Sequence, residues 1–403
     1  MEKSGNGIDA LPPAEAYVRL LFRFMKRKSI PRIFRVFWPV VLAVIFSPML
    51  FLRAGLAEEA EEKDGASQKK SSFLILPIIS YTPETRWAGG VGGLYTFHPK
   101  GADLQGRPSA LTFVAIYTQN HQYTVSLKPE LYLNKESFFL AGNIAVTRFP
   151  DKFFGIGNAT PDSLEEGYTP HQISFEAALW KKIVPAGPLY AGLVYSYDHY
   201  RFTEFDPAGQ LATGSIPGSG GGSHSGFGLL FKWDDRDNVF APTKGRQFSF
   251  SASLYNSLFG SDYNYALFKV DLRSYIPING AQVLAVQGVL QTTAGTTPFA
   301  ALPKLGGDSI MRGYYGGRYR DRALAAVQAE YRLPVWWRFG LVAFAGLGDV
   351  AADISRLKPS SFKYSVGWGI RFKVNPQEGA NIRLDFGYGK GVSGMYFTAG
   401  ESF

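Results

Sequence analysis

The chain has 403 residues, a formal net charge of +9, 46% hydrophobic residues, 15% aromatic residues, 45 glycines and no cysteine. The absence of cysteine excludes disulfides and thiolate metal sites, and the five histidines lack metal-ligand spacing. Nine basic and three acidic residues lie within 1–57, so that segment carries most of the net charge. The remaining charges are scattered and mixed in sign, which argues against a nucleic-acid partner. No cofactor or metal site is expected.

The amino-terminal segment has the order of a secretory signal. Basic residues from Lys26 to Arg35 precede an apolar run that ends before Arg53, and Gly55-Leu-Ala57 follows. Basic, apolar and then small residues in this order predict a cleaved signal peptide with a basic n-region over 1–57. An inner-membrane anchor is the alternative, because the apolar run is just long enough to span a bilayer. Residues 58–72 are polar and without periodicity, which predicts a short periplasmic leader.

From residue 73 onward the dominant pattern is a period of two. Phe248, Phe250 and Leu254, for example, alternate with serines. Such alternation is typical of strands with one apolar and one polar face. We therefore predict an all-β protein, a transmembrane antiparallel β-barrel of about 16 strands over 73–403, with 14 strands as the alternative. The expected strands are 73–80, 86–97, 109–119, 122–134, 137–149, 168–183, 187–204, 223–236, 245–258, 263–278, 281–295, 321–334, 338–350, 361–374, 380–390 and 394–403.

The end of the chain indicates whether the polar face of the strands lines the interior of a barrel or the outside of a soluble protein. Alternation by itself also fits a soluble sandwich, whose apolar face is the core. The last segment closes on the aromatic Phe403, and a terminal strand that pairs with the first leaves no backbone group open to lipid. Together with the predicted signal peptide, this indicates an integral protein of the bacterial outer membrane, in contact with its lipid. On this reading Glu401 faces lipid.

One connection carries a recognisable motif. The segment Gly306-Gly-Asp-Ser-Ile-Met-Arg-Gly-Tyr-Tyr315 resembles the sixth loop of the outer-membrane assembly and secretion barrels, the superfamily of BamA, TamA and FhaC, also called the bacterial surface antigen family. The segment from Trp233 to Gly245 resembles the family's Asp-x-Arg-Asp turn, and Gln328-Ala-Glu-Tyr-Arg332 resembles the strand after the loop. The final strand, with Gly400 three residues before Phe403, resembles the family's closing strand and assembly signal.

The resemblance implies a loop folded back into the barrel. Arg312, Gly313 and Tyr314 occupy the places of the family's loop motif, whose arginine meets acidic residues on neighbouring strands. Glu330 is the expected partner of Arg312. The family's second acidic position is Gly346 in this chain, so Arg312 is expected to lack one partner, and Asp349 falls on the opposite face of its strand.

The resemblance also implies a function. We expect a non-enzymatic pore for protein insertion or translocation that acts on unfolded outer-membrane or secreted clients. The family's POTRA repeats, which receive the client, do not fit into residues 58–72, so a separate periplasmic partner is expected to supply that role. The closing seam is the expected site of opening, because Pro77 removes a hydrogen-bond donor from the first strand.

Two further classes of function stay open. A passive porin-like channel is the first, and the lumen-facing Lys269, Arg273, Arg371, Lys373 and Arg383 would give it a preference for anions. An outer-membrane lipase is the second, and it requires a serine and a histidine within hydrogen-bond reach. The stretch Gly218–Gly226 contains both residue types but lacks the spacing of a nucleophile elbow.

Overall fold

The computed structural model describes residues 71–98, 109–133, 137–184, 187–375 and 380–403. The predicted signal peptide lies outside these residues, as does nearly all of the predicted leader. No helix among the described residues is long and apolar enough to span a membrane.

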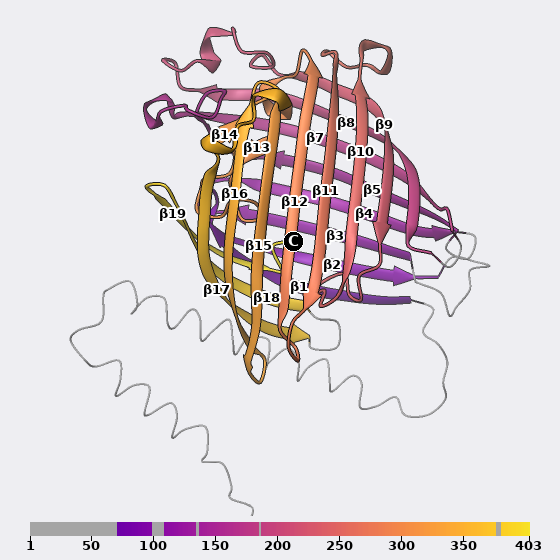
Figure 1. The fold of residues 1–403 in the computed structure, drawn as a ribbon. Coiled ribbons are helices and arrows are strands. Elements are labelled where there is room, and N and C mark those ends of the chain that lie inside the picture. The colour runs from indigo at the N-terminus through magenta and orange to yellow at the C-terminus, as the bar shows by residue number, and fades with distance from the viewer. Residues whose placement is uncertain (1–70, 99–108, 134–136, 185–186, 376–379) are drawn as a thin grey trace, which may run out of the picture. The chain divides into compact units, whose positions relative to one another are not determined.

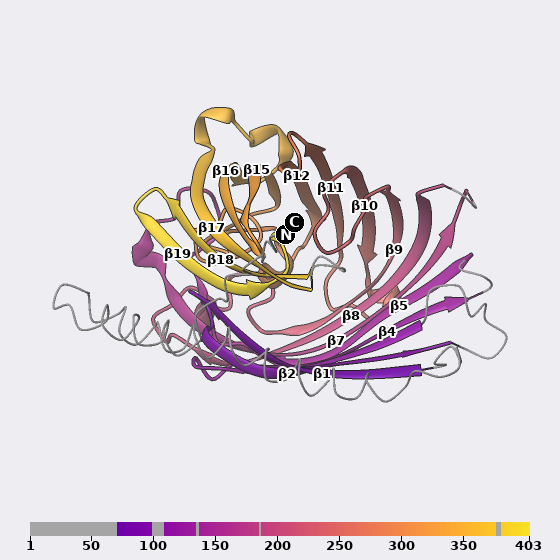
Figure 2. The same cartoon turned by 90° about the horizontal axis from the view of Figure 1, so that it is seen from below.

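The described residues form a closed, all-antiparallel β-barrel of sixteen long strands (Figures 1 and 2). The predicted fold class and strand number are therefore confirmed. Three shorter strands lie in the connections: β6 (Asp151–Phe153) beside β7, and the pair β13 (Lys304–Leu305) and β14 (Tyr319–Arg320). The barrel strands are β1 (Ser71–Thr82), β2 (Arg86–Phe97), β3 (Ser109–Thr118), β4 (Tyr123–Leu133), β5 (Phe138–Arg148), β7 (Glu166–Lys182), β8 (Leu189–Phe205), β9 (Gly222–Asp234), β10 (Gly245–Tyr255), β11 (Tyr265–Pro277), β12 (Val283–Gly295), β15 (Ala323–Trp336), β16 (Phe339–Ala351), β17 (Lys363–Asn375), β18 (Ala380–Gly389) and β19 (Val392–Ala399).

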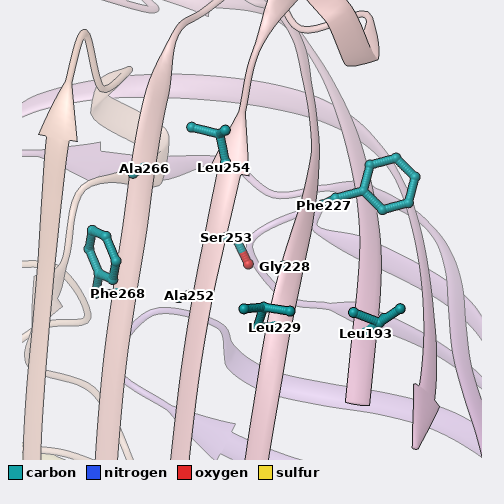
Figure 3. A pocket seen from close by; sticks show the side chains of 9 residues that line it. All are labelled: Leu193, Phe227, Gly228, Leu229, Ala252, Ser253, Leu254, Ala266 and Phe268. Atoms are coloured by element: carbon teal, nitrogen blue, oxygen red, sulfur yellow. The ribbon is translucent and has the colours of Figure 1, made fainter.

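The alternation in the sequence separates the two faces of the wall. On β8 to β11 the outward side chains are large and apolar, and many stay exposed because lipid would be their solvent. Figure 3 shows a shallow groove on this outer surface, about 350 Å³ in volume, where small residues interrupt the apolar face. It is lined by Leu193, Phe227, Gly228, Leu229, Ala252, Ser253, Leu254, Ala266 and Phe268.

The two ends of the barrel differ in their connections. At one end the described turns are short, such as 278–282 and 337–338, whereas the other end carries 149–165, 206–221 and 296–322. Outer-membrane barrels have short periplasmic turns and long extracellular loops. The end with the long connections is therefore the extracellular one.

The first and last strands meet in a weak seam. All twelve residues of β1 pair with β2, whereas β1 pairs with β19 through Tyr81 and Phe397 alone. Strand β19 ends at Ala399, and Gly400 adopts a φ of 83°, a left-handed conformation that ends the extended strand. Closure of the barrel thus rests on a single residue pair.

The last four residues correct two expectations. The closing strand was predicted over 394–403, but Gly400 and Phe403 lie beyond it and turn into the barrel, as the position of the carboxy terminus in Figure 2 shows. Glu401 does not face lipid, because its side chain accepts a 2.7 Å hydrogen bond from Arg371 inside the barrel. Placing a carboxylate against hydrocarbon is costly, whereas the interior offers it cationic partners.

Candidate functional site

The connection between β12 and β15, residues 296–322, folds back into the barrel. Its central residues Met311, Arg312 and Tyr314 are almost completely buried. Met311 and Tyr314 belong to an apolar cluster with Leu305 of the same loop and with Leu324, at the start of β15. The loop is therefore a packed internal segment and not a polar surface turn.

Arg312 meets two carboxylates inside the barrel. Its guanidinium lies 3.0 Å from Glu330 on β15 and 2.6 Å from Asp385 on β18, and all three side chains are fully buried. The guanidinium also stacks 3.5 Å from the centre of the Phe344 ring, on β16. Charge-assisted hydrogen bonds with two carboxylates offset the cost of burying the cation.

The second partner of Arg312 corrects an expectation. The resemblance left Gly346 in the family's acidic position and so predicted one missing partner, but Asp385 supplies the second carboxylate. A Cβ at Gly346 would lie 3.3 Å from the sulfur of Met311, so the loop itself occupies the space above this glycine. Asp349 makes no contact with Arg312 and pairs instead with Lys363 at 2.9 Å.

Two glycines allow the loop backbone to touch the barrel wall. A Cβ at Gly387 on β18 would lie 2.5 Å from the carbonyl carbon of Arg312, and one at Gly313 would lie 2.8 Å from Gly387. Gly313 has a φ of 107°, which favours glycine, and its amide donates to the Tyr396 hydroxyl on β19 at 2.9 Å. The second position of the Arg-Gly-Tyr motif therefore requires glycine, because the backbones of the loop and of β18 lie too close together for a side chain.

The same loop reaches both sides of the seam. The Tyr314 hydroxyl accepts a 3.0 Å hydrogen bond from the amide of Lys390, in the turn before β19. The Gly316 amide donates at 2.6 Å to Glu84, in the turn between β1 and β2. Burial raises the pKa of Glu84, and this hydrogen bond only partly offsets that effect. The loop thus bridges the seam that the strands leave nearly unpaired.

The carboxy-terminal residues join the same interior network. Glu401 binds Arg371, and the Ser402 hydroxyl donates to Glu330, the carboxylate that also holds Arg312. Phe403 is buried against inward residues of β11 and β12, and its terminal carboxylate accepts a 3.0 Å hydrogen bond from Arg332 on β15. The loop motif and the end of the chain therefore share one carboxylate.

The network alternates arginines with carboxylates. Arg371 is its centre, since it contacts Asp385 at 2.5 Å and Glu401 at 2.7 Å and reaches Glu330 at 3.4 Å. Four arginines and four side-chain carboxylates take part, together with the terminal carboxylate of Phe403, and Asp308 of the loop is the one side-chain carboxylate with substantial exposure. The members are Arg312, Arg332, Arg371, Arg383, Asp308, Glu330, Asp385 and Glu401.

Sequence reasoning assigned Arg312 and Glu330 to this site but missed Asp385 and Glu401. Asp385 carried a usable signal, because it alternates with Leu384 and Phe386 and so was expected to face the lumen. Glu401 carried none, because strand parity continued through Gly400 pointed it outward. Its true direction depends on the turn at that glycine.

Other arrangements give little support for catalysis. The His199 Nδ1 lies 3.0 Å from the Ser223 hydroxyl on the outer face, so the proximity required for the lipase alternative does occur. Among the described residues, no carboxylate hydrogen-bonds the other ring nitrogen of His199, as a hydrolase triad requires. No group of three metal-ligating side chains is found within the described residues.

These features define a class: a sixteen-stranded outer-membrane barrel with an internal loop locked by arginine. A model described as the Omp85 superfamily domain matches residues 104–403, and the chain belongs to this superfamily. Barrels of this family are non-enzymatic transporters and insertases, which sets the lipase alternative aside. Membership also confirms the expected resemblance and an integral location in the bacterial outer membrane.

Solved structures show the same fold at low identity. BamA from Haemophilus ducreyi lacking POTRA domains 1–3 matches with a TM-score of 0.56 and 18% identity, over 82% of this chain and 70% of that chain. CdiB from Acinetobacter baumannii matches with a TM-score of 0.55 and 13% identity, over 82% and 60%. CdiB from Escherichia coli matches with a TM-score of 0.54 and 10% identity, over 81% and 62%. No curated protein sequence matches.

Proposed function

We propose that this barrel inserts or translocates client polypeptides without catalysis, by opening at the seam between β1 and β19. The observation that carries the proposal is the single residue pair, Tyr81 with Phe397, that joins these strands. Few backbone hydrogen bonds have to break before the wall opens there. Everywhere else in the barrel, neighbouring strands pair over eight or more residues.

The free edge of β1 suits a client strand. Phe73, Leu74, Ile75 and Leu76 are all at least half exposed, so β1 is apolar on both its outer and inner faces. An edge strand offers unpaired amides and carbonyls to an incoming strand, and apolar side chains on both faces tolerate a hydrophobic partner. An unfolded outer-membrane or secreted polypeptide has the chemistry to pair with this edge.

The internal loop then holds the two margins of the seam, β1 and β19, together. It is fixed to the β15–β18 wall through Arg312 and contacts both margins of the seam through Glu84 and Tyr396. Separation of the margins has to break one of the two contacts. The loop motif of Arg312, Gly313 and Tyr314 therefore sets how readily the seam opens, whereas Gly400 and Phe403 withhold the end of the chain from β1.

The passive-pore alternative has weaker support. Of the five cations expected to attract anions, Arg273 lies 2.9 Å from Asp271, and Arg371 and Arg383 are paired with carboxylates in the network. Of these five only Lys269 and Lys373 stay exposed, so most of the cationic surface expected to select anions is neutralised. A separate periplasmic partner would deliver the client to the barrel.

A reversible lock on the seam tests the proposal. Because the chain has no cysteine, Tyr81→Cys with Phe397→Cys introduces one disulfide between β1 and β19. In a deletion strain that expresses this variant, we expect oxidation to lower the levels of other outer-membrane proteins and reductant to restore them.

The matched control places the disulfide in a fully paired part of the wall. Val146→Cys with Ile173→Cys joins β5 to β7 at a register pair and should leave those levels unchanged. Small-solute permeability is measured in the same cells. Normal levels of outer-membrane proteins with a locked seam, or altered permeability alone, would refute insertion through the seam and favour a pore.

A further inference from the structure

Outside the seam, three basic side chains form a row on the lipid-facing surface. Arg148 on β5 is the register partner of His171 on β7, which in turn is the register partner of Arg201 on β8. Arg148 has the parity of the outward Ile144 and Val146, and His171 has the parity of the outward Ile173. All three basic residues lie where these strands meet the long extracellular connections. Adjacent strands are about 4.8 Å apart, so the three basic groups are close neighbours.

The row is only partly compensated within the protein. Arg148 lies 3.3 Å from Glu204, a carboxylate that is itself largely exposed, and also donates to the carbonyl of His121. Arg201 is exposed and has no ion pair or side-chain hydrogen bond with any described residue. Basic groups directly opposite each other on neighbouring strands favour an outside anion between them.

The next rows toward the membrane centre are apolar on β5 and β7, whereas β8 places His199 and Tyr197 in them. Below Arg148 and His171 lie Val146 and Ile173, which are register partners and 44% and 52% exposed. Ile144 and Phe175 form the row after that. The surface thus runs from cationic to apolar along the membrane normal, which is the order of an anionic headgroup followed by acyl chains.

We infer that this surface binds a phosphate-bearing lipid of the extracellular leaflet, with its phosphate between Arg148 and Arg201 and its chains along Val146, Ile173 and Phe175. Guanidinium groups match phosphate oxygens in charge and geometry. Lipid is the occupant because the cationic row continues directly into the apolar band that faces the bilayer. The inference is independent of the proposed function, since it involves neither the seam nor the loop.

Native mass spectrometry of the full chain in detergent tests the inference with two probes, diphosphorylated lipid A and its dephosphorylated form. We expect the barrel to retain the phosphorylated lipid preferentially. Arg148→Gln with Arg201→Gln should weaken that retention about tenfold, the equivalent of about 1.4 kcal/mol, and remove the preference.

The control keeps the strand and changes the end of the barrel. Lys181 lies on the outward face of β7 at its periplasmic end, and Lys181→Gln should retain the lipid as the unchanged chain does. Heat-modifiable electrophoretic mobility shows that each variant is folded. Equal retention of both lipids, an unaffected double variant, or full competition by inorganic phosphate would each overturn the inference.

Discussion

The wall formed by β15 to β18 and the wall formed by β1 and β2 differ in what covers their inner faces. The first is filled on its inner face by the loop and by buried ion pairs around Glu330 and Asp385. The inner face of β1 carries exposed Leu74 and Leu76, which pack against no loop core. The β19 margin of the seam is therefore supported by the filled wall, whereas the β1 margin is held mainly by its pairing with β2. Opening of the seam should deform the β1–β2 hairpin and leave the β15–β18 wall intact.

The largest effect is expected from removing the shared carboxylate. Glu330→Ala leaves Arg312 and Arg371 short of a partner in a buried site, and we expect a loss of about 3–5 kcal/mol in the free energy of unfolding. Urea unfolding of the barrel in detergent, followed by tryptophan fluorescence, measures it. Glu130→Ala is the control, since Glu130 on β4 is exposed. Equal losses in both variants would mean that the buried ion pairs do not stabilise the β15–β18 wall.

An intermediate effect is expected where the loop touches the β15–β18 wall. Gly387→Ala places a methyl group 2.5 Å from the Arg312 carbonyl carbon, so the loop has to shift, at a cost of about 1–3 kcal/mol. Limited proteolysis should cut within 296–320 sooner than in the unchanged chain. Gly288→Ala is the control, because a Cβ there meets nothing within 4 Å. An intact loop in Gly387→Ala would mean that this contact does not hold it.

The smallest effect concerns the contact with the β1–β2 hairpin. Burial raises the pKa of Glu84 above its ordinary value of 4.5, so folding favours the protonated carboxyl. This stabilisation is complete below the ordinary value and is lost as the pH rises through the raised pKa. The free energy of unfolding, measured by urea unfolding in detergent, should therefore fall as the pH rises over that range.

Glu84→Gln keeps an acceptor oxygen for the Gly316 amide but cannot ionise. The variant should lack this contribution to the pH dependence of the free energy of unfolding. The same dependence in Glu84→Gln as in the unchanged chain would assign it to another group. Either result bears on the difference between the two walls, because the loop hydrogen-bonds to the β1–β2 hairpin through Glu84.

The expected strands agree closely with the observed ones because each strand crosses a boundary between lipid and a polar interior. Alternation at Phe248, Phe250 and Leu254 reflects that boundary directly. Glu330 was assignable for the same reason, since its parity faces the lumen. Asp385 had the correct parity too, but nothing local connects it with a loop residue 73 positions away.

The sequence by itself determined the membrane-spanning period, the number of strands and the internal loop motif, because these depend on residues within one strand or turn. Only the tertiary structure decided how Arg312 is held, where Glu401 points and how weakly β1 meets β19. Those outcomes depend on distant segments that compete for the same interior: Met311 fills the space above Gly346, and the turn at Gly400 carries the end of the chain to the arginines and away from lipid.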